Sequence, residues 1–168
     1  DVYKRQHAVF FAGAFPALEW QPSDPAAEAL ASIAAYRAEY LGRAEVPSDN
    51  CAAPLLLDAT SPADWPTAAD AILCINMVHI SPWDATLGLF AGAAQLLGSG
   101  GGPLILYGPY LEQGVETAPS NLDFDASLRA RDPRWGLRHA QEMDRLAASH
   151  SMGRSARYGL PANNIMLV

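Results

Sequence analysis

The chain has 168 residues, of which 50% are hydrophobic and 17% are charged, and its formal net charge at pH 7 is −7. These values fit one domain with a substantial core and exclude extensive disorder. The acidic balance argues against nucleic acid as a partner, because such binding depends on basic contacts to phosphates. The two cysteines cannot form a disulfide framework, and no apolar stretch is long enough for a membrane span, so we expect a cytoplasmic protein without membrane attachment.

The apolar segment near the N-terminus has two interpretations. Lys4 and Arg5 precede an apolar run over 8–18, as in a signal peptide, but Pro16 interrupts that run. The spacing of its apolar residues favours a helix over 6–15. A helix of this kind should follow a strand and a turn, so residues 1–5 are interpreted as a foreign or truncated start.

Short apolar runs then alternate with helical patterns along the chain. The sequence predicts strands at 18–21, 55–57, 71–75, 103–107, 155–160 and 165–168. It predicts helices at 25–41, 82–97, 122–131 and 138–149, with Pro25 and Pro82 at their starts and Gly42 and Gly98 at their ends. Strands separated by helices imply right-handed crossovers, so we expect an α/β fold with a doubly wound, mostly parallel sheet in a single domain over 1–168.

Two acidic residues follow successive strands of this predicted sheet. Ligands of open parallel sheets bind at the carboxyl ends of the strands, where Asp24 and Asp58 are expected to lie. A carboxylate at the first position can accept the hydroxyls of a ribose, and one at the second can accept the amine of an adenine. Asp is also typical of helix caps and turns, so purely structural roles for both residues are the alternative.

The strand at 71–75 is followed by the polar run Asn76 to His79. His79 is a candidate general base near neutral pH, and the alternative is a histidine that caps the next helix or satisfies a loop carbonyl. The other histidines are scattered and no Cys/His spacing fits a metal site, so we expect no metal.

A long polar and aromatic segment over 111–138 follows the strand at 103–107. It is a possible lid over the site, because long ordered loops at such edges often carry function. The alternative is a surface subdomain held by ion pairs among Arg129, Arg131, Asp125 and Asp132. A basic patch of Arg129, Arg131 and Arg134 keeps nucleic acid conceivable, although the net charge disfavours it.

Several longer motifs resemble a known family. The motifs are Leu18–Asp24, Cys74–Trp83, Leu106–Tyr110, Pro119–Asn121 with Phe124 and Asp125, Arg131–Gly136, and Pro161–Asn164. Over residues 6–168 the chain resembles the uncharacterised class I methyltransferase-like family that includes methyltransferase-like protein 26. The resemblance implies a Rossmann-like fold that binds S-adenosylmethionine (SAM).

The resemblance also implies roles for individual residues. It puts Asp24 at the ribose position, Asp58 with Ala59 at the adenine position, and Asn76 with Met77 near the methionine part of the cofactor. The candidates that would orient or deprotonate a methyl acceptor are His79, Tyr107 and Tyr110. The motifs do not name the acceptor, for which a small molecule is favoured.

The start of the chain departs from the family pattern. Family members begin with a strand and a loop that ends in Gly-x-Gly-Gln-His, whereas here only Gln6 and His7 match. The absent strand would be the central one, between the second and fourth strand positions, so two sheet edges are expected to lack a partner. The alternative to a methyltransferase is therefore a catalytically silent binding domain, or a fragment that does not bind the cofactor.

Overall fold

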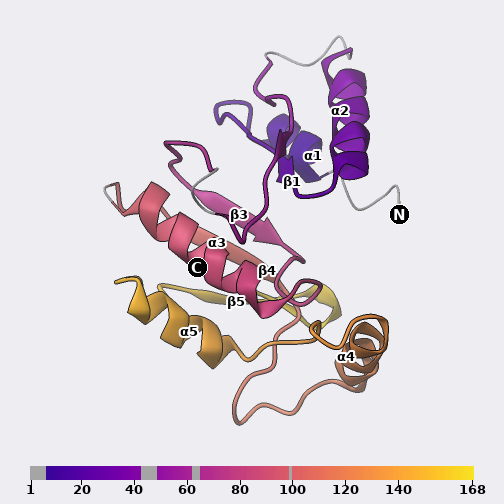
Figure 1. Cartoon of the computed structure of the whole chain (residues 1–168), viewed down its shortest axis with the longest axis vertical. Helices are drawn as coiled ribbons and strands as arrows, with labels where there is room; N and C mark the ends of the chain where they lie inside the picture. Colours follow the sequence, from indigo (N-terminus) through magenta and orange to yellow (C-terminus); the bar gives the residue numbers. More distant parts are fainter. Residues whose placement is uncertain (1–6, 43–48, 62–64, 99) are drawn as a thin grey trace. The chain divides into compact units, whose positions relative to one another are not determined.

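The computed structural model describes residues 7–42, 49–61, 65–98 and 100–168 (Figure 1). The expected foreign start at 1–5 lies outside these residues. The described chain forms two compact units, one ending at Asp58 and one beginning at Ala59. The helices and strands, in chain order, are α1 (His7–Ala14), β1 (Ser23–Asp24), α2 (Ala27–Leu41), β2 (Leu55–Leu56), β3 (Ile72–Ile75), α3 (Trp83–Leu97), β4 (Leu104–Gly108), α4 (Pro119–Arg131), α5 (Ala140–Ser149), β5 (Arg157–Leu160) and β6 (Asn164–Leu167).

In the N-terminal unit, β1 and β2 form a short parallel pair in which Asp24 lies opposite Leu56. The prediction of a strand at 18–21 is wrong, because that segment contains only an isolated bridge between Trp20 and Cys51. Pro22 directly follows this predicted strand, yet its carbonyl accepts a hydrogen bond of 2.9 Å from the Leu55 N–H. Proline lacks the donor but keeps the acceptor, so pairing continues past it.

Buried Asn50 organises the small core of the N-terminal unit. Its Nδ2 donates to the carbonyls of Ala12 and Leu18, each at 3.0 Å, and its Oδ1 accepts from the Tyr40 hydroxyl at 3.1 Å. Cys51 beside it is fully buried and, like Ala12 and Tyr40, belongs to this core. A single amide thus connects α1, α2 and the segment before β2, which satisfies polar groups that burial would otherwise leave unpaired.

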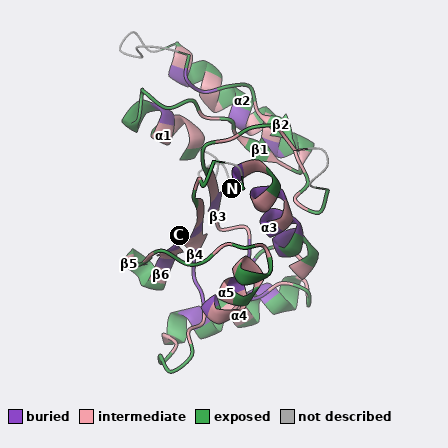
Figure 2. Cartoon of the chain, turned by 90° about the vertical axis from the view of Figure 1, so that its left-hand side faces the viewer, coloured by how far each residue is buried: buried purple, intermediate pink, exposed green. Residues whose placement is uncertain are grey.

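The C-terminal unit is built on a four-stranded sheet of order β3-β4-β6-β5. The β3–β4 pair is parallel, and β6 runs antiparallel to both β4 and β5. Helices α3 and α5 lie on the same side of this sheet (Figures 1 and 2). The predicted α/β, Rossmann-like fold class is confirmed, including the two C-terminal strands.

Small residues on α3 allow other segments to approach its backbone closely. A Cβ at Gly88 would lie 1.8 Å from the Ala59 carbonyl oxygen, and a Cβ at Gly92 would lie 2.6 Å from the Trp65 ring. The buried face of α3 therefore includes Gly88 and Gly92, whereas Leu87 of the same helix is 39% exposed. The apolar spacing alone did not reveal a face made partly of glycine.

Each sheet in the described part of the chain has two edge strands, which are β1 and β2 in the N-terminal unit and β3 and β5 in the C-terminal unit. The expectation that a central strand would lie beside two such edges stays a prediction.

Candidate ligand site at the carboxyl ends of the strands

The two acidic candidates of the N-terminal unit follow parallel neighbouring strands. Asp24 is the last residue of β1, and Asp58 is the second residue after β2. The Oδ1 atom of Asp24 accepts a hydrogen bond of 2.9 Å from the Ala26 N–H two residues on, in the turn before α2, as the structural alternative of a turn residue predicts. A carboxylate accepts through both oxygens, so this contact is compatible with a ligand contact as well. Ala59 begins the other unit, with its carbonyl against α3.

In the C-terminal unit, Asn76 and His79 meet at the end of β4. Asn76 follows β3 with a positive φ of 55°, a conformation that Asn tolerates better than most residues, and its N–H donates to the Tyr107 carbonyl at 2.9 Å. A Cβ at Gly108 would lie 3.1 Å from His79 Cε1 and 3.4 Å from Asn76 Oδ1. The absence of a side chain at Gly108 therefore lets these two predicted site residues converge.

His79 is enclosed on several sides and is only 4% exposed. The edge of its imidazole contacts Phe124 of α4, with ring centroids 5.5 Å apart and planes at 67°. Its carbonyl accepts a hydrogen bond of 3.0 Å from the Gly136 N–H in the loop after α4. A ligand can therefore reach the imidazole only after one of these covering residues moves.

The loop between Asn76 and α3 is held by its own contacts. The Ser81 hydroxyl donates to the Met77 carbonyl at 2.9 Å and lies 3.1 Å from the Met77 sulfur. Arg138 Nη2 donates to the Ser81 carbonyl at 3.3 Å, and its guanidinium lies 5.6 Å from the centre of the Trp83 ring. Burial and the nearby charge of Arg129 lower the pKa of Arg138. Arg138 was not among the residues predicted from the sequence, because nothing in its local pattern sets it apart from the other arginines of 129–138.

The two candidate tyrosines lie in different environments. Tyr107 is a half-buried residue of β4 that pairs with Met166. Tyr110 is 6% exposed and belongs to the main core. Burial, with a smaller contribution from nearby Cys74, raises the pKa of Tyr110 far above its ordinary value. Burial also raises the pKa of Cys74 to about 12. Tyr110 and Cys74 therefore stay protonated and uncharged at neutral pH, as is usual for residues in a core.

In the segment expected as a lid or as a surface subdomain, the expected ion pair between Arg129 and Asp125 is present, whereas Asp132 pairs with Arg134 instead. The lid stays a prediction. Asp125 accepts from Arg129 Nε at 2.7 Å and from the Leu137 N–H at 2.6 Å, which connects α4 to the loop that follows it. Asp132 pairs with Arg134 at 2.7 Å, and Arg131 lies 5.4 Å from the centre of the Trp135 ring.

The first turn of α4 is anchored to the turn between β5 and β6. The Nδ2 of buried Asn121 donates to the Asn163 carbonyl at 3.2 Å. The Asn163 side chain donates in return to the Ser120 hydroxyl at 3.3 Å. Together with Asp125, these contacts fix α4, and with it Phe124, beside His79. This anchor was not visible in the sequence, since its partners are about forty positions apart.

Within the described part of the chain, no group of three or more His, Cys, Asp or Glu side chains is arranged to hold a metal ion. Nor does any helix there combine the length and apolar character that a bilayer crossing requires.

Several solved structures share the fold of this chain. LaPhzM shares 14% identity, with a TM-score of 0.74 over 95% of this chain and 44% of that one. The mitomycin 7-O-methyltransferase MmcR shares 17%, with a TM-score of 0.71 over 93% and 42%. LepI in complex with SAM shares 14%, with a TM-score of 0.69 over 97% and 39%. The chain thus spans less than half the length of each protein, and at these identities the likeness concerns the fold alone.

The family comparison covers nearly the whole sequence. Residues 4–168 match the model of a family described as protein of unknown function, DUF938. The narrower resemblance to the group of methyltransferase-like protein 26 stays a prediction. The chain belongs to the DUF938 family and has a Rossmann-like fold.

Proposed function

We propose that this chain carries the cofactor domain of a SAM-dependent methyltransferase that acts on a small molecule. The observation that supports this most is the fold likeness to MmcR, named as an O-methyltransferase, and to LepI, whose structure contains SAM. SAM and the acceptor come to this chain by proposal, because fold alone does not determine function.

The residues at the carboxyl ends of the strands fit the chemistry of that cofactor. Asp24 would accept the ribose hydroxyls, and Asp58 with the backbone of Ala59 would bind the adenine. Asn76 and Met77 would lie near the methionine part. What supports the proposal at Asn76 is the approach of its side chain to Gly108 beside His79.

Methyl transfer asks for positioning more than for covalent help from the protein. When bound, SAM supplies an activated methyl group; the chain must hold the acceptor in line and exclude water. His79 would take or orient the acceptor proton, with Tyr107 as a further contact. Phe124 would help to exclude water, since it already covers the imidazole.

The alternative of a catalytically silent domain has one observation in its favour. His79 and Tyr110, two of the three candidate acid–base residues, are 4% and 6% exposed. A domain that binds SAM without turnover would not need these groups to reach an acceptor.

Calorimetric titration with SAM and with its demethylated product tests the proposal. It should be done on this chain and on a version in which a strand and a glycine-rich loop replace residues 1–5. We expect one-site binding that the replacement strengthens. Absence of binding to both chains would refute the cofactor assignment. If binding is seen, a screen of small-molecule acceptors with radiolabelled SAM separates the enzyme from the silent domain.

A further inference from the structure

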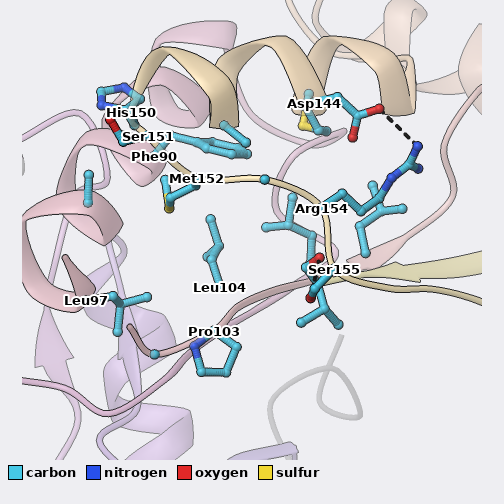
Figure 3. Close-up of a pocket in the computed structure, with 18 of the residues that line it drawn as sticks. Phe90, Leu97, Pro103, Leu104, Asp144, His150, Ser151, Met152, Arg154 and Ser155 are labelled. Carbon is cyan, nitrogen blue, oxygen red and sulfur yellow. Dashed lines mark hydrogen bonds and ion pairs between the residues drawn. The ribbon is translucent and has the colours of Figure 1, made fainter. Parts of the chain in front are cut away.

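A cavity of about 440 Å³ lies in the C-terminal unit, and neither Asn76 nor His79 lines it. Its walls come from the second half of α3, from α5 with the turn that follows it, and from the first residues of β4 (Figure 3). Leu104, where β4 begins, lines the cavity, whereas Gly108, where β4 ends, lies beside His79. These two ends of one strand are roughly 13 Å apart, at 3.3 Å per residue.

The interior of the cavity is apolar and adaptable. Phe90, Leu97 and Met143 are each 3% exposed, and Phe90 and Met143 belong to the main core. Met152 and Leu104 also line the cavity. Methionine side chains adjust to the shape of a guest and make favourable contacts with aromatic rings. The lining therefore suits a flat apolar ring system.

Charged and polar side chains lie around the mouth. Arg154 Nη2 pairs with Asp144 Oδ2 at 3.0 Å, and the two side chains are 30% and 33% exposed. Figure 3 shows this pair at one end of the cavity and His150 at the other. A guanidinium carries several N–H donors, so pairing through one nitrogen leaves Arg154 with donors for a second anion.

We propose that this cavity is a second binding site, which takes a small aromatic acid with its rings among Phe90, Met143 and Met152 and its acid group on Arg154. The volume lies within the range of small-molecule sites and is too small for a partner helix. The pattern of an apolar interior with a few polar groups at the mouth is typical of such sites. The proposal does not depend on the identity of the ligand at the SAM site.

A pair of fluorescent probes tests it: 8-anilinonaphthalene-1-sulfonate, which is an aromatic acid, and N-phenyl-1-naphthylamine, its neutral analogue. Ala147→Leu should fill the cavity, because Ala147 lines it, whereas Ala148→Leu is the matched control, since Ala148 is exposed on the same helix and does not line it. We expect saturable one-site binding of the acid, weakened about tenfold or more by Ala147→Leu and unchanged by Ala148→Leu. Thermal melts verify folding, and Ala94→Leu repeats the test from α3.

Arg154→Gln tests the acid group separately. It should weaken the sulfonate probe severalfold and leave the neutral probe unchanged. Equal effects on both probes would overturn the role of Arg154. The site itself would be overturned by a lack of saturable binding, by equal losses in the two alanine variants, or by competitive displacement of the probe with S-adenosylhomocysteine.

Discussion

The Cα of Gly108 lies directly against the imidazole of His79, so that a methyl group there would stand 3.1 Å from Cε1 and 3.2 Å from Nδ1. Phe124 contacts the edge of the same ring. The histidine is therefore held between the end of β4 and α4, and its position depends on both. This arrangement makes a glycine and an aromatic residue part of the environment of the proposed acid–base group.

Gly108→Ala should displace His79 and destabilise the protein by about 1–3 kcal/mol, the usual cost of overpacking. Because Phe124 restricts the ring, the imidazole cannot simply move away from the new methyl group. Urea unfolding measures the stability, and the His79 ring signals in NMR report the displacement. Gly100→Ala is the control, because a Cβ at Gly100 meets no atom within 4 Å. Unchanged ring signals in the Gly108 variant would contradict the described geometry.

Gly88→Ala should be more damaging, because its Cβ would lie 1.8 Å from the backbone oxygen of Ala59. Backbone yields less readily than the end of a side chain, so we expect a loss of about 3 kcal/mol or failure to fold. Chemical denaturation and soluble yield measure the effect against Gly100→Ala. A variant as stable as the control would show that Ala59 does not pack on α3 as described.

Asp125→Asn tests the connection between α4 and the following loop. Burial raises the pKa of Asp125, but hydrogen bonds from Arg129 and from the Leu137 N–H outweigh that effect and hold the pKa below its ordinary value of 3.8. The stabilisation is thus present above pH 3.8 and is lost as the pH falls through the lower folded-state pKa. Since Arg129 is 48% exposed, the ion pair contributes only about 0.5–1 kcal/mol.

Urea unfolding as a function of pH provides the measurement for this prediction. The advantage of the wild-type protein over Asp125→Asn should be constant near neutral pH and should shrink below pH 3.8. Asp123→Asn is the control, because Asp123 is exposed on the same helix. An advantage that grows on acidification would have the wrong sign for a carboxylate with a lowered pKa.

Two substitutions at Asp24 separate its turn contact from its proposed ligand contact. Asp24→Ala removes the acceptor for the Ala26 N–H and should cost about 1 kcal/mol of stability. Asp24→Asn keeps an oxygen for that N–H and should cost much less. Both should weaken S-adenosylhomocysteine binding, because neither presents two anionic oxygens to the ribose. If Asp24→Asn binds as tightly as the wild type, Asp24 has only the turn role.

The sequence predicted those features that depend on local pattern. The buried strand Ile72–Ile75 and the helix that begins at Trp83 follow from apolar runs and from Pro82. The segment around Pro22 was misjudged, because a proline ends donation to a neighbouring strand but not acceptance from it. A proline in a sequence pattern is usually taken to end a strand, and this leaves out the hydrogen bonds that its carbonyl can still accept.

The candidate site could be predicted only in outline. The position of Asn76 and His79 after a strand was visible, and the structure brings both to Gly108. The enclosure of His79 was not visible, because it depends on Phe124 and Gly136, which lie far along the chain. The burial of Tyr110 likewise follows from packing between elements, which no local pattern encodes.

Mapping S-adenosylhomocysteine by NMR tests the central claim most directly. On the chain with the strand and glycine-rich loop in place of residues 1–5, the account predicts that backbone signals of Asp24, Asp58, Ala59, Asn76 and Met77 shift together and saturate with one affinity. Signals of Ala147 and Met152 in the separate cavity should stay unchanged. Shifts confined to that cavity, or no shifts at millimolar ligand, would contradict a SAM site at the carboxyl ends of the strands.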